Sequence, residues 1–191
     1  MILVFLLASC AGLYKNINSS SIYYNNGKDI IGDLNVAYEY NLHKKFNNNK
    51  YRKRESSTNY VAIALKVKNN TNKEIILEPQ TFLIFIDNNK VETSEILDYY
   101  EQVKQGSVIY LAHAIWGPWV TNNGVTTFWP IGLGFGLINL IVAEIENTKF
   151  KNNLIDQYIF GKLIKPNETI FGLLFLKDYK YENLDFKYLE R

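Results

Sequence analysis

Few side chains in this sequence are able to carry acid–base or nucleophilic chemistry. The only histidines are His43 and His113, and His43 is expected at the surface because it follows a predicted strand beside lysines. Ser107, His113 and Asp98 are the ingredients of a triad that would activate a serine hydroxyl for acyl transfer. No nucleophile-elbow sequence supports this triad, and a buried, hydrogen-bonded His113 is the simpler interpretation. We therefore expect no catalytic site, with a hydrolase that uses His113 as the alternative.

Cofactor, metal and nucleic-acid sites are not expected either. The glycines of Gly132–Gly136 lack the spacing and the strand–helix setting of a dinucleotide-binding loop, and no Gly-Lys-Ser/Thr follows them. Two histidines and one cysteine are too few for a conventional zinc site. A formal net charge of +2 does not favour a nucleic-acid partner.

One basic run, Arg52-Lys53-Arg54, lies in a segment that is predicted to be a polar loop. Its simplest interpretation is a solvated loop. The alternative is a contact with an anionic lipid headgroup or glycan, because clustered basic side chains are attracted to anionic surfaces.

Cys10 has the most informative sequence context. It is the only cysteine, so it forms no intrachain disulfide, and it directly follows the apolar stretch Met1–Leu7 and the small residues Ala8 and Ser9. That stretch is too short to span a bilayer, and it lacks the basic start of a standard secretory signal. The pattern favours a signal peptide over residues 1–9, and the alternative is a cytoplasmic protein with an apolar first strand.

The motif Leu7-Ala8-Ser9-Cys10 resembles the end of a bacterial lipoprotein signal, and this resemblance covers residues 1–10 only. It implies cleavage before Cys10, acyl chains on Cys10, and a location in the bacterial cell envelope, with the outer membrane preferred over the inner. Several acyl chains anchor a protein firmly, whereas one chain binds only marginally. The membrane and an envelope protein are then the expected partners.

Residues 10–33 are rich in asparagine and serine and are predicted to be a polar tether, because they offer little apolar surface to bury. Residues 34–191 are predicted to form a single domain. Apolar residues alternate over 34–41 and 60–68, and further strands are predicted at 74–77, 81–86, 170–176 and 184–188.

The sequences Val61–Thr71 and Pro166–Phe175 are similar to immunoglobulin-like domains of bacterial envelope lipoproteins. The resemblance implies a mainly β fold, an immunoglobulin-like antiparallel β-sandwich, whose domains bind or present rather than catalyse. A partly helical insertion, rich in glycine and aromatic residues, is predicted at about 94–161.

This insertion has no Asp, Glu, Lys or Arg over residues 105–143. Three interpretations stay open: an insertion packed on the sandwich through Leu137, Ile141 and Ile145; a surface that docks a protein or enters the membrane; and a membrane span, for which the segment is short. The candidate partner-binding residues are Trp116, Trp119, Phe128, Trp129 and Phe135.

We therefore predict a non-catalytic, lipid-anchored envelope protein with a binding or structural role in an envelope assembly. The alternative is a membrane-active protein that inserts the apolar segment 114–143.

Overall fold

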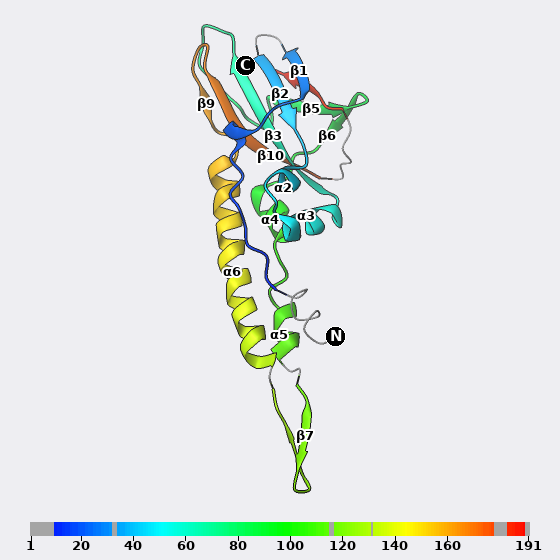
Figure 1. The fold of residues 1–191 in the computed structure, drawn as a ribbon. Helices are drawn as coiled ribbons and strands as arrows, with labels where there is room; N and C mark the ends of the chain where they lie inside the picture. Colours follow the sequence, from blue (N-terminus) through cyan, green and yellow to red (C-terminus); the bar gives the residue numbers. More distant parts are fainter. Residues whose placement is uncertain (1–9, 32–33, 115–116, 131, 178–182, 190–191) are drawn as a thin grey trace.

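The computed structural model describes residues 10–31, 34–114, 117–130, 132–177 and 183–189. It is an elongated molecule with a β-rich head, a long helix that extends from the head, and a β-hairpin at the opposite end (Figure 1). Helices and strands cover about equal shares of these residues. The prediction of a mainly β fold is therefore confirmed in part: antiparallel sheets form the head, and helices cover about as many residues as strands do.

The head contains a four-stranded sheet, a three-stranded sheet and one two-stranded pair. The four-stranded sheet has the order β1-β2-β3-β10, the three-stranded sheet has the order β11-β5-β6, and β4 pairs with β9; all pairings are antiparallel. The strands are β1 (Asn26–Ile31), β2 (Leu34–Glu39), β3 (Tyr60–Asn69), β4 (Ile75–Ile76), β5 (Phe82–Ile86), β6 (Asn89–Val91), β9 (Leu163–Ile164), β10 (Thr169–Lys177) and β11 (Asp185–Tyr188).

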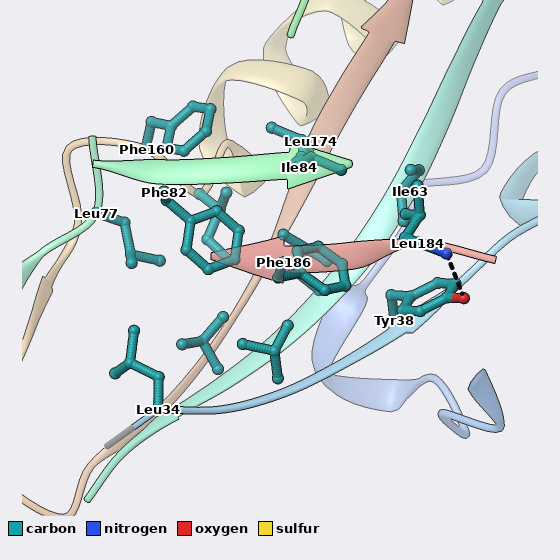
Figure 2. Close-up of a cluster of buried hydrophobic side chains, with 14 of the residues drawn as sticks. Leu34, Tyr38, Ile63, Leu77, Phe82, Ile84, Phe160, Leu174, Leu184 and Phe186 are labelled. Atoms are coloured by element: carbon teal, nitrogen blue, oxygen red, sulfur yellow. Dashed lines mark hydrogen bonds between the residues drawn. The ribbon is translucent and has the colours of Figure 1, made fainter. Parts of the chain in front are cut away.

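The two larger sheets contribute to one hydrophobic core, which Figure 2 shows. Leu34 and Ile63 come from the four-stranded sheet, and Phe82, Ile84 and Phe186 come from the three-stranded sheet. The hydroxyl of Tyr38 reaches across this core and accepts a hydrogen bond from the Leu184 N–H at 3.0 Å. Period-two alternation correctly predicted the inward faces of β2 and β3.

Helices cover the other face of the four-stranded sheet. They are α2 (Leu42–Lys45), α3 (Asn49–Ser56), α4 (Ile96–Val103) and α6 (Gly132–Gln157). A second core lies under them, in which Ala62 and Ala64 of β3 meet Tyr99 of α4 and Phe150 of α6. Small side chains on β3 leave room for these aromatic rings, which explains why β3 is buried on both faces.

Two local predictions are wrong. Residues 47–54 are predicted to be a loop, but most of helix α3 lies within them. The helix is held on the domain by Tyr51 and Glu55, which lie four residues apart on one side of it and are both buried. The sequence of residues 144–161 predicts two short helices or one kinked helix, but in the structure this stretch belongs to the single helix α6 as far as Gln157.

Residues 11–19 do not form the predicted tether; they pack along α6, and we call them the strap (Figure 1). Tyr14 and Ile17 are buried. The Tyr14 N–H donates to Glu146 at 2.7 Å, and the Tyr14 hydroxyl donates to Asn153 at 2.7 Å. Hydrogen bonding to polar side chains of α6 thus fixes a segment that has little apolar surface of its own.

Side-chain amides satisfy the backbone of the strap in place of a neighbouring strand. Asn153 accepts from the Ile17 N–H at 2.7 Å and donates to the Ile17 carbonyl at 3.2 Å. Asn48 binds the backbone of Lys15 in the same two-bond way, at 2.7 and 2.8 Å. Because a buried amide has both a donor and an acceptor, each pairs completely with one residue of extended chain.

Candidate functional site

Residues 105–143 have no formal charge, and we call them the charge-free end. The part of this region that the structure describes lies at the end of the molecule opposite the head (Figure 1). It comprises α5 (Ile109–Ala114), the hairpin of β7 (Trp119–Asn122) and β8 (Val125–Phe128), and the first half of α6. Charged residues begin again at Lys104 and Glu144. Of the insertion predicted at about 94–161, the charge-free end projects away from the head, whereas α4 and the second half of α6 pack on the four-stranded sheet.

The hairpin is formed by local pairing alone. Asn123 and Gly124 both have positive φ, 50° and 81°, as a tight two-residue turn between twisted strands requires. Trp119 pairs with Phe128 at the base, with ring centroids 5.2 Å apart. Neither strand pairs with a third strand among the described residues. Since an isolated two-stranded hairpin is marginally stable in water, this element needs a further contact.

Gly117 allows the two arms of the hairpin to meet. A Cβ at this position would overlap the backbone carbonyl of Trp129, which follows β8. The Trp129 N–H donates to the Pro118 carbonyl at 3.0 Å and closes the base of the hairpin. Glycine is required here because only a residue without a side chain permits this approach.

The first half of α6 buries small residues and exposes large ones. Its buried residues are Gly132, Gly136 and Ala143, which suits close packing against α5. Leu137, Ile141 and Ile145, predicted to pack on the sandwich, are exposed by 43%, 56% and 50%. That packing prediction is wrong, because the glycine face is the one that meets a neighbour. A large apolar surface on a single helix end is typical of an interaction site.

Four of the five candidate partner-binding residues are described, and all four belong to this end. Trp119, Trp129 and Phe135 are exposed by 71%, 60% and 53%, and Phe128 is half-buried against Trp119. Trp116 lies outside the described residues. Sequence reasoning did not identify four further exposed apolar side chains: Val108, Ile109 and Leu111 in or beside α5, and Leu13 of the strap. The lack of charged residues was the only signal for the first three.

Cys10 lies beside the same end and is exposed. The Ala11 N–H donates to the Asn139 side chain of α6 at 2.9 Å. Gly12 exchanges two hydrogen bonds with the Gln105 side chain, at 2.8 and 2.7 Å. Burial raises the pKa of Tyr110 in α5, and the nearby Cys10 thiol adds to the rise. The strap thus holds Cys10 beside α5 and α6. Residues 1–9, which contain the predicted signal, lie outside the described residues.

Three buried polar residues, His43, Tyr99 and Glu55, connect helices α2, α4 and α3 through hydrogen bonds. The His43 Nε2 atom lies 2.9 Å from the Tyr99 hydroxyl, which donates to Glu55 at 2.8 Å. Burial raises the pKa of Glu55 to about 7, although the Ala62 N–H and the Tyr99 hydroxyl oppose the rise. Burial lowers the pKa of His43 to about 3. The expectation of a surface His43 is wrong, because helix α2 turns this ring inward against Tyr51 and Phe150.

The candidate residues for catalysis lie partly outside the residues whose side chains the structure describes. His113 belongs to α5, and its side chain lies outside the described residues, so the hydrolase alternative stays a prediction. Among the described residues, no three His, Cys, Asp or Glu side chains group as a metal site would require.

Comparison of the chain with protein-family models, with curated proteins and with solved structures found no match. Among the described residues, no helix combines the length and the hydropathy that crossing a membrane requires.

Proposed function

We propose that this protein is a lipid-anchored, non-catalytic protein of the bacterial cell envelope that docks its charge-free end into the leaflet that holds its acyl chains. The observation that carries the proposal is the position of Cys10, the predicted lipid attachment site, against the longest stretch of the sequence that lacks formal charges. In this arrangement the end that carries the lipid also meets the membrane.

The depth of the charge-free end matches one leaflet. Ala11 meets α6 at Asn139, and the helix continues for about 10 Å beyond that level to Gly132. Four-residue strands add about 13 Å in the hairpin. A leaflet with its headgroups is about 20–22 Å thick. The end is therefore about 23 Å deep, so it reaches slightly past the bilayer centre when upright and stays short of it when tilted.

The chemistry of the exposed side chains favours the interface between headgroups and acyl chains. Trp119 and Trp129 are of the type that accumulates at bilayer interfaces. The turn residues Asn122–Gly124 are polar but uncharged, so they suit headgroups better than the hydrocarbon centre. We therefore place the hairpin in the interface at a tilt.

The head then projects from the membrane on α6. Asn139, which binds Ala11 next to Cys10, and Gln157 are about 27 Å apart along α6. The strap is hydrogen-bonded to the helix at both of these residues. We propose that the head is an immunoglobulin-like sandwich, supported by its two antiparallel sheets and their common core. Its role is binding or structural, within an envelope assembly, where it presents its surface to an envelope protein.

Flotation with phosphatidylcholine vesicles tests the proposal on the acyl-free variant Cys10→Ser, produced without residues 1–9. This variant is expected to float with neutral vesicles, and adding Trp119→Ser and Trp129→Ser should abolish the flotation.

The matched control is Tyr23→Ser, because Tyr23 is exposed by 79% and its neighbour Tyr24 donates a hydrogen bond to the Leu65 carbonyl of β3 in the head. It should float like the parent protein. A parent protein that stays at the bottom of the gradient, or a tryptophan double variant that floats unchanged, would contradict docking through the hairpin.

A further inference from the structure

Helices α2 and α3 carry a dense group of basic side chains on the outside of the molecule. We call this group the basic face, and it consists of Lys44, Lys50, Arg52, Lys53 and Arg54. All but the half-buried Lys50 are exposed, because α3 directs only Tyr51 and Glu55 inward. The chain has a formal charge of only +2, so the rest of the sequence is net acidic.

No acidic side chain of the described residues neutralises the charges of the basic face. Within the described part of the chain, none of the five has an acidic partner at ion-pair distance, whereas the neighbouring Lys45 lies 3.8 Å from Glu39. Repulsion among unpaired like charges destabilises a short helix slightly. An external anion would remove this repulsion.

The basic face lies close to the predicted lipid attachment site. The side chain of Lys50 lies directly on Gly12, where a Cβ would overlap it. Gly12 is two residues from Cys10, which is within about 8 Å along the chain. Arg52, Lys53 and Arg54 continue along α3 at about 1.5 Å per residue. If the bilayer surface lies at Cys10, the charged groups of these side chains lie within one to two Debye lengths of it.

We infer that the basic face binds anionic phospholipid headgroups of the leaflet in which Cys10 is anchored. This inference rests on the proposed function, since that docking brings α3 to the membrane surface. Basic clusters beside an acyl anchor attract anionic lipids and supply the second contact that stable, oriented anchoring needs. The hairpin and the basic face would then touch the same leaflet at two points and fix the tilt of α6.

Vesicle titrations test this inference with the Cys10→Ser protein at about 20 mM salt, where screening is weak. The charge variant carries Arg52→Gln, Lys53→Gln and Arg54→Gln. The matched control removes the same charge from the head through Lys73→Gln, Lys90→Gln and Lys187→Gln, all exposed positions. The two vesicle types are pure phosphatidylcholine and phosphatidylcholine with phosphatidylglycerol.

The charge variant should bind anionic vesicles on the order of a hundredfold more weakly than the parent. Its binding to neutral vesicles should not change, and the head variant should bind both types like the parent. Raising the salt to about 500 mM should remove the difference between charge variant and parent.

Equal losses in the charge and head variants would overturn the inference, because net charge and not the basic face would then attract the lipid. Parent binding that is the same for both vesicle types would overturn it as well, while leaving hairpin docking intact. Absence of parent binding to either vesicle type would contradict the inference and the proposed function together.

Discussion

Replacement of Glu55 or His43 should uncover a pH dependence of stability that the two residues cancel in the native protein. Both are buried and both contact the Tyr99 hydroxyl, at 2.8 and 2.9 Å. Burial raises the pKa of Glu55 from 4.5 to about 7 and lowers that of His43 from 6.5 to about 3. Over a wide pH range, Glu55 therefore holds one proton more in the folded than in the unfolded chain, and His43 holds one proton fewer.

The two contributions have opposite signs. Between pH 4.5 and 7 an unfolded Glu55 is ionised while the folded one holds its proton, so its stabilising contribution is lost as the pH rises. Between pH 6.5 and 3 an unfolded His43 takes up a proton that the folded one refuses, so its contribution is lost as the pH falls. From pH 4.5 to 6.5 the slopes cancel, since one proton is involved in each.

Single variants break this cancellation. In Glu55→Gln the free energy of unfolding should rise by about 3 kcal/mol from pH 4.5 to 6.5, because only the histidine slope remains. In His43→Gln it should fall by about the same amount over this range. The lowered pKa of Glu146 acts only below pH 4.5 and does not enter this window.

Urea unfolding of the Cys10→Ser protein at half-unit pH intervals measures these slopes. The readout is the slope with pH, so a uniform loss of stability in either variant does not confuse it. The double variant should restore a flat profile. Parallel profiles for the parent and Glu55→Gln would refute the reasoning, because Glu55 would then titrate as it does in the unfolded chain.

Three further predictions concern the strap and the charge-free end. Asn153→Ala should lower the free energy of unfolding by about 2–3 kcal/mol in urea titrations, because it leaves buried polar groups of Tyr14 and Ile17 without partners; an unchanged midpoint would show that the strap is not packed in solution. Trp119→Ser should change that free energy by less than about 0.5 kcal/mol, since the ring is 71% exposed. Gly117→Ala should open the hairpin base and speed amide hydrogen exchange in β7 and β8 while leaving β3 protected; equal exchange in both proteins would contradict this requirement for glycine.

Strand positions in the head followed from local patterning. Alternation over 34–41 and 60–68 predicted β2 and β3 because one face of each strand meets the core. Helix α3 was not predicted because its buried side consists of Tyr51 and Glu55. A carboxyl-bearing residue in a buried position produces no apolar periodicity in the sequence.

The strap could not be predicted because its contacts are non-local hydrogen bonds. Asn48, Asn153 and Gln105 look like polar surface residues in the sequence, yet each binds the backbone of a residue that is distant along the chain. Charge depletion at 105–143 did indicate an unusual surface. It did not indicate which face of α6 would be buried, since glycine carries no hydrophobic signal.

All three tryptophans of the protein lie in the charge-free end, so intrinsic tryptophan fluorescence reports on this region alone. The most direct measurement is the emission of the Cys10→Ser protein with phosphatidylcholine vesicles whose acyl chains are brominated near the headgroup or near the methyl end. Docking at the interface predicts a blue shift with ordinary vesicles and stronger quenching by the bromines near the headgroup. An unshifted spectrum that neither brominated lipid quenches would contradict membrane docking of the charge-free end.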